Sequence, residues 1–254
     1  MIKLKNKKAQ IAIWVIIAIA IVAVIGFLFV FSKKPIGTEA DISDPKGRIE
    51  KCARDAVNEA ADEILKHGGF IEPKNYKLYQ NNKATYLCEN TGNYKPCVNQ
   101  HPLLLNEIKK EIKEYSYPII EKCFLDIKDE LEKRKYVVSF GETGINISLG
   151  SDRIYLDIMK DIEISKNDLN SRYKEFNIEV NNPLYDLAKV AIEIAGQESK
   201  YCYFEYVGYM ILYPRFDIKK FTMSDSTKIY TIKDKYSNKE MNIATRGCAI
   251  PAGI

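Results

Sequence analysis

The 254-residue sequence has very little histidine, and it lacks the common catalytic signatures. Its two histidines are His67, at the predicted end of a helix, and His101, before a proline, and we expect structural or solvated roles for both. No HExxH, GxSxG, Walker or EF-hand sequence occurs, and no carboxylates have metal-ligand spacing. Asp157, Asp161 and Glu163 alternate along a predicted strand, as on a solvated face. The sequence therefore predicts no catalytic residue, cofactor or metal, and an extracytoplasmic enzyme of unknown type remains an alternative.

The six cysteines lack the spacing of a zinc site or of a thiol-exchange motif. An even number, all located beyond residue 50, favours disulfides in an oxidising compartment, with buried free thiols as the alternative. Fifteen pairings are possible, and spacing alone does not choose among them. The pairings that we expect are Cys88–Cys97 around a polar loop, Cys52–Cys123 between two helices, and Cys202–Cys248 near the carboxyl end.

An excess of charge of one sign is absent from most of the chain. The sequence has 38 basic and 34 acidic residues, and its formal net charge is +4. Six of the lysines lie within residues 1–34, so the remainder has a net charge of about −2. The basic footprint of a nucleic-acid-binding protein is missing, and we expect no nucleic-acid partner.

One long apolar run is present, from Ile11 to Phe31, and it carries no charge. A helix of about 21 residues spans on the order of 30 Å, the thickness of a bilayer core. Lysines precede the run, which places the amino terminus inside by the positive-inside rule; a cleaved secretory signal is the alternative. The expected organisation is a single-pass protein of the cytoplasmic membrane, with a cytoplasmic segment at 1–10, a transmembrane helix at 11–31, a linker at 32–44 and an extracytoplasmic domain at 45–254.

Residues 7–13, Lys-Lys-Ala-Gln-Ile-Ala-Ile, resemble the start of archaeal prepilins with a class III signal peptide. The resemblance implies cleavage between Ala9 and Gln10 and self-assembly through the amino-terminal helix. Trp14 departs from the pattern, because pilins of this type commonly carry Glu there. A type IV pilin-like filament subunit is therefore an alternative function. The longer pattern also resembles uncharacterised single-span archaeal surface proteins, which imply no activity.

Beyond residue 44 the pattern predicts an α+β domain, in which helices pack on one mostly antiparallel sheet and disulfides tie the fold. Apolar residues recur at helical spacing over 45–67, 102–114, 118–133 and 182–194. Pro118 is expected to break or kink the second and third helices apart. Alternating residues predict strands at 136–140, 145–149, 153–159, 173–180, 217–223, 228–233 and 240–246, and a hairpin within 76–88.

Residues 201–213 are apolar almost throughout, and they favour a buried helix over a strand. Tyr203, Tyr206, Tyr209 and Tyr213 within it are the candidate recognition surface, because tyrosine offers a large contact area with a polar tip. The alternative is a second layer of the core. Asn146 begins an N-glycosylation pattern. The leading hypothesis is a membrane-anchored structural, adhesive or protein-binding module.

Overall fold

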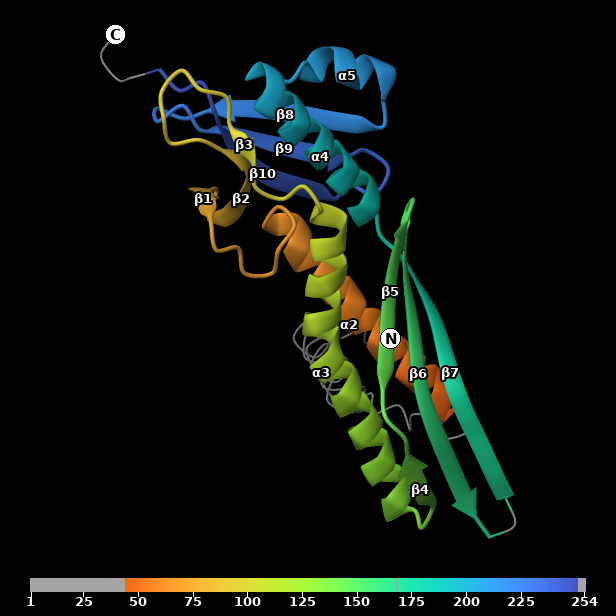
Figure 1. Cartoon of the computed structure of the whole chain (residues 1–254). Coiled ribbons are helices and arrows are strands. Elements are labelled where there is room, and N and C mark those ends of the chain that lie inside the picture. The colour runs from red at the N-terminus through yellow and green to blue at the C-terminus, as the bar shows by residue number, and fades with distance from the viewer. Residues whose placement is uncertain (1–43, 168, 251–254) are drawn as a thin grey trace, which may run out of the picture. The chain divides into compact units, whose positions relative to one another are not determined.

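The computed structural model describes residues 44–250 except residue 168. The chain divides into two compact units, Met1–Asp44 and Pro45–Ile254, and every described helix and strand belongs to the second (Figure 1). The helices are α2 (Pro45–Lys66), α3 (Leu104–Lys133), α4 (Leu184–Tyr201) and α5 (Tyr206–Leu212). The strands are β1 (Tyr76–Tyr79), β2 (Asn82–Glu89), β3 (Val98–Asn99), β4 (Val137–Phe140), β5 (Gly144–Gly150), β6 (Arg153–Lys166), β7 (Leu169–Asn181), β8 (Phe216–Thr222), β9 (Lys228–Asp234) and β10 (Glu240–Arg246).

The expected membrane anchor has to be corrected. Among the residues that the structure describes, none of the helices combines the length and the apolar character that crossing a membrane requires. The predicted span at residues 11–31 lies outside the described residues. The single-pass fold and the location inferred from that run therefore have no support in the described structure.

A four-stranded antiparallel sheet packs against the helix pair α2 and α3. β6 is its central strand: β7 pairs along one edge, and β4 and β5 share the other. α3 contacts β4 and β5, while α2 contacts β7 (Figure 1). The alternating pattern of each strand places its apolar residues toward the helices, where Ile154, Leu156 and Phe176 are fully buried. Because the helices bury one face of this sheet, its strands alternate apolar and polar residues, and this alternation predicted them from the sequence.

α3 is one continuous helix, and the predicted break at Pro118 is wrong. Pro118 lies inside the helix on its exposed face. The opposite face buries Ile112, Ile120 and Phe124, so apolar contacts on both sides of the proline keep the helix continuous. Proline removes one helical hydrogen bond, at a cost of about 3 kcal/mol, whereas each buried large side chain contributes about 1.5–3 kcal/mol. The packing is the larger contribution.

The expectation of one mostly antiparallel sheet is also corrected, because a second sheet is present and is mixed. It has six strands in the order β1-β2-β10-β9-β8, with β3 also paired to β2. β10 runs parallel to β2 and antiparallel to β9. α4 contacts β2, β9 and β10 and so covers one face of this sheet. β2 and β10 are far apart in sequence, and the alternation within a strand carries no information about its partner.

The six cysteines lie in three pairs at disulfide distance. Cys52–Cys123 joins α2 to α3, Cys88–Cys97 closes the loop after β2, and Cys202–Cys248 joins the end of α4 to the segment after β10. Their Cα–Cα separations are 6.5, 5.3 and 5.9 Å, within the range for a disulfide. These are the three pairs that we expected from the sequence.

Candidate interaction surface

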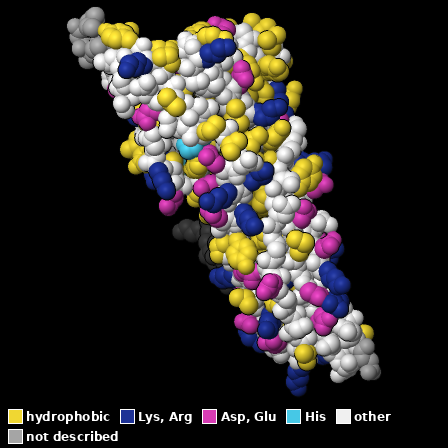
Figure 2. All heavy atoms as spheres, in the orientation of Figure 1, with side chains coloured by type: hydrophobic (Ala, Val, Ile, Leu, Met, Phe, Trp, Pro, Cys, Tyr) yellow, Lys and Arg dark blue, Asp and Glu magenta, His cyan; other side chains and the backbone are white. Residues whose placement is uncertain are grey.

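α5 is an apolar helix that lies on the surface, where we had expected burial. Its sequence is Tyr-Val-Gly-Tyr-Met-Ile-Leu, and none of its residues is buried. Ile211 and Leu212 are each 75% exposed. The exposed apolar residues on α5 and its flanks, which we name the α5 patch, are Tyr201, Tyr203, Val207, Ile211, Leu212 and Tyr213. Figure 2 shows hydrophobic side chains gathered over this part of the fold, at the upper end of the view. Grouped exposed apolar residues of this kind mark interaction sites.

Local chemistry explains why a helix forms here. Glu205 precedes the first turn, and its carboxylate accepts hydrogen bonds from the backbone N–H of Gly208 at 3.2 Å and from the Tyr203 hydroxyl at 2.8 Å. The bond from Tyr203, followed by that from Gly208, lowers the pKa of Glu205 and keeps this cap charged. Phe204 is fully buried, and its ring lies against those of Tyr209 and Tyr230. The helix is therefore capped by one residue and anchored by its neighbour.

A buried polar cluster holds the amino-terminal side of the α5 patch. Glu198 of α4 has no exposed surface; one of its oxygens binds Lys228 at 2.6 Å, and the other accepts the Tyr230 hydroxyl. Lys228 also donates to the carbonyl of Cys202 at 2.5 Å, next to the Cys202–Cys248 pair. Burial, followed by the negative charge of Glu198, raises the pKa of Tyr230, so this phenol stays protonated. The chain entering the patch is thus pinned to β9 and to the segment after β10.

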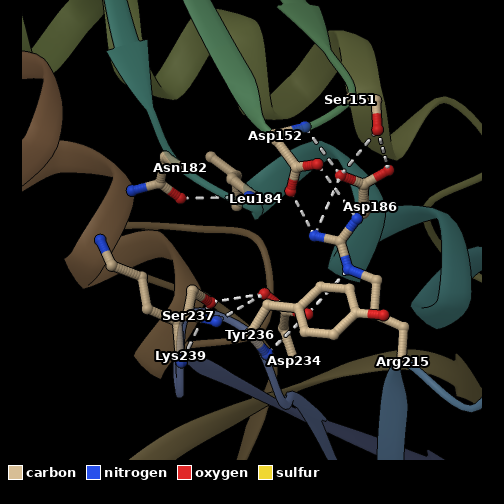
Figure 3. A network of polar contacts seen from close by, with 10 residues as sticks. All are labelled: Ser151, Asp152, Asn182, Leu184, Asp186, Arg215, Asp234, Tyr236, Ser237 and Lys239. Carbon is tan, nitrogen blue, oxygen red and sulfur yellow. Dashed lines mark hydrogen bonds and ion pairs between the residues drawn. The ribbon is translucent and has the colours of Figure 1, made fainter.

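The carboxyl-terminal side of the patch is held by Arg215, which follows α5 and precedes β8. Its guanidinium faces three carboxylates from different elements: Asp152 in the turn after β5, Asp186 in α4 and Asp234 at the end of β9 (Figure 3). The Nε–Oδ1 distance to Asp234 is 2.7 Å, and the side chain of Asp234 is 1% exposed. Hydrogen bonds to Asp234, above all, raise the pKa of Arg215, so its charge is permanent. Both ends of the segment are therefore fixed.

Positive charge borders the patch without an ion-pair partner among the described residues. The Lys220 ammonium lies 4.6 Å from the ring centroid of Tyr203 and 5.1 Å from that of Tyr206. Lys200 lies 4.9 Å from the ring centroid of Tyr201. The charge of Lys220 also helps to lower the pKa of the nearby Glu205 carboxyl, although the two groups are not in an ion pair. The surface is apolar at its centre and basic at its border.

The four predicted tyrosines lie on this surface, but they do not contribute equally to it. Tyr203 and Tyr213 are 46% and 52% exposed, whereas Tyr206 and Tyr209 are half-buried. The most exposed members, Ile211 and Leu212, were missed, because aromatic residues were singled out and aliphatic ones were assigned to the core. A helix that is apolar on every face is ordinarily buried, so the sequence carries no signal that places Ile211 and Leu212 at the surface.

The remaining sequence-based sites are scattered. Asn146 is exposed on β5, and Asp161 and Glu163 on β6 both pair with Arg172 of β7. Asp157 is on the same strand and is half-buried. The processing site at Ala9 and Gln10 lies outside the described residues. Across residues 44–250, with residue 168 left aside, no three or more His, Cys, Asp or Glu side chains are grouped so as to hold a metal ion.

Comparison with known proteins adds no relative to these observations. No protein-family model, no curated protein and no solved structure matches the chain.

Proposed function

We propose that the chain is a protein-binding module and that the α5 patch is its binding surface. One observation carries the proposal: a seven-residue apolar helix with no buried residue is held at the surface by a cap, a disulfide pair, the buried Glu198 cluster and the Arg215 ion-pair network. A surface fixed in this way loses little conformational entropy when a partner binds. Tyrosine-rich apolar surfaces are typical of protein interfaces.

The chemistry of the patch specifies a partner that carries apolar side chains beside carboxylates. Ile211, Leu212 and Val207 require an apolar counterpart, because burying such side chains contributes about 1.5–3 kcal/mol each. Lys200 and Lys220 at the border favour acidic groups, which steer association. We therefore commit to an acidic protein segment with apolar anchors as the occupant. A second copy and an anionic lipid surface are the competing occupants.

Site-directed photocrosslinking tests this proposal. A photoreactive phenylalanine analogue at position 212 of the full chain is expected to crosslink one protein repeatedly, through a peptide in which apolar residues adjoin Asp or Glu. The same analogue at position 169 is the matched control, because Leu169 has an exposure of 74% on β7. Crosslinks from position 169 should be weaker than those from position 212 and should go to different proteins.

Binding of the purified partner then gives the quantitative test. Leu212→Ser should raise the dissociation constant at least tenfold, which is equivalent to about 1.4 kcal/mol of binding free energy. Leu169→Ser should change it less than twofold. Lys220→Gln should reduce the dependence of the association rate on salt. Equal crosslinking from positions 212 and 169 would contradict the proposal. So would crosslinks only to a second copy, or binding only to anionic vesicles.

A further inference from the structure

A second feature, independent of the α5 patch, is a pocket of about 380 Å³ beside the start of α3. Its walls come from the loop after α2, from β2, from the loop before α3 and from α3 itself. Phe70 and His101 form an aromatic wall, with ring centroids 4.6 Å apart. Thr85 of β2 is 1% exposed, and its hydroxyl donates to the carbonyl of His67. The volume is within the range of small-molecule sites.

The polar groups of this pocket are mostly hydrogen-bond acceptors. Glu111 uses one carboxylate oxygen to accept the backbone N–H of Ile71 at 2.9 Å, and no contact in the described structure involves its other oxygen. His101 binds the carboxylate of Glu107 through Nδ1 at 2.9 Å, so in the neutral ring Nε2 is an acceptor. The Gln100 amide nitrogen donates to the carbonyl of Val98, which leaves its oxygen as a third acceptor.

The charged side chains of the pocket also favour a ligand that donates hydrogen bonds and carries positive charge. Glu72 and Glu111 line it, and neither is in an ion pair among the described residues. The one cationic side chain in the lining is Lys74. A pocket lined by both carboxylates and an aromatic ring suits an organic ammonium group, because a ring face and a carboxylate both attract positive charge.

We propose that this pocket binds a small ligand through an amino group, with the ammonium placed between Glu111 and the ring of Phe70. The acceptor atoms of His101 and Gln100 then receive the ligand's remaining N–H or O–H donors. The source of the amine can be a free metabolite or a lysine side chain of a peptide. Both present the same chemistry to the site.

Two-dimensional NMR of the full chain, titrated with defined probes, tests the proposal. Putrescine and glucosamine are the free amines, N-acetyl-lysinamide represents a peptide side chain, and 1,4-butanediol and glucose are the uncharged counterparts. We expect shifts at Phe70, Thr85 and His101 with an amine probe, and affinity at least tenfold higher than for its uncharged counterpart. A preference for N-acetyl-lysinamide would support the site and assign it to peptides.

Two variants separate binding from folding. Glu111→Gln keeps an oxygen that can accept the Ile71 N–H, so the fold should persist while amine affinity falls at least tenfold. Glu114→Gln, three residues further along α3 and outside the pocket lining, is the matched control and should leave affinity within twofold. Equal binding of amines and their uncharged counterparts would overturn the proposal. Shifts that survive Glu111→Gln, or no shifts with any amine, would do so as well.

Discussion

Glu198 is the carboxylate on which the cluster beneath the α5 patch depends. It is fully buried, and it binds Lys228 and Tyr230. Glu198→Ala would leave the buried Tyr230 hydroxyl without its acceptor and the Lys228 charge with the Cys202 carbonyl as its remaining acceptor. We expect the free energy of unfolding to fall by about 3–5 kcal/mol, as for other buried pairs that lose one partner. Urea denaturation measures this change.

Glu193→Ala on the same helix is the control for Glu198→Ala. Glu193 is exposed and has a hydrogen bond only to Gln197 in the described structure, so its loss should change stability by less than about 0.5 kcal/mol. A similar effect of the two substitutions would show that the buried cluster contributes nothing beyond helix propensity.

The contribution of Asp225 to the stability of the fold depends on pH. Burial raises the pKa of this carboxyl, but hydrogen bonds from Lys77 and from Thr227 together outweigh burial and hold the pKa at about 2. Because the folded pKa lies below the ordinary value of about 3.9, the stabilisation is complete above about pH 4 and is lost as the pH falls toward 2. Carbon-13 NMR titration of the full chain should show this pKa, and Lys77→Met should move it upward.

Lys110→Met is the control for that titration, since it removes the same charge from an exposed site on α3. It should leave the pKa of Asp225 where it is. An Asp225 pKa near 4 in the unmodified chain would contradict the assigned contacts.

At the scale of elements, periodicity located most helices and strands but did not determine their surroundings. α2, the β1–β2 hairpin and the strands from β4 to β10 follow apolar spacing. α3 continues through Pro118 because packing on its buried face outweighs a local break. In α5 the prediction fails at the level of burial: its apolar residues predict a buried helix, and none of them is buried. Local pattern cannot show which element a face will meet.

The disulfide pairs also act at this scale, and their loop lengths predict an order. Cys52–Cys123 closes a separation of 71 residues and Cys88–Cys97 one of 9. In the chain-entropy account, the long loop stabilises by about 4 kcal/mol and the short one by about 3 kcal/mol. Paired Cys→Ala substitutions should therefore cost more at Cys52 and Cys123. Chemical denaturation of the two double variants under oxidising conditions measures the order, and the reverse order would contradict it.

At the scale of the whole second unit, long-range pairing was beyond prediction from the sequence. The parallel pairing of β10 with β2 joins segments more than 150 residues apart. The periodicity within a strand does not encode such a partner, and it does not show that the strands divide into two sheets. The charge network of Arg215 could not be predicted for the same reason, because its three aspartates are far apart in the sequence, in a turn, at the start of a helix and at the end of a strand.

The Arg215 network has a consequence for how the two sheets are coupled. Asp152 belongs to the turn between β5 and β6 of the four-stranded sheet, whereas Asp234 ends β9 of the six-stranded sheet, and Arg215 binds both (Figure 3). Arg215→Met keeps an unbranched apolar stem and removes this link. We expect amide hydrogen exchange to accelerate around residues 151–153, where the Asp152 N–H donates to Asp186, while β10 stays protected.

Arg172→Met is the matched control for Arg215→Met, because Arg172 also binds two carboxylates, Asp161 and Glu163, but at half-exposed positions within one sheet. Exposed pairs contribute about 0–1 kcal/mol, so the exchange of residues 151–153 should not change in this variant. Arg215 presents a different case, since its partner Asp234 is 1% exposed and loses its only guanidinium contact in the described structure. Equal acceleration of exchange in both sheets after Arg215→Met would indicate general destabilisation and contradict a specific coupling. Acceleration confined to the turn between β5 and β6, to the start of α4 and to the end of β9 would identify Arg215 as the residue that couples the sheets.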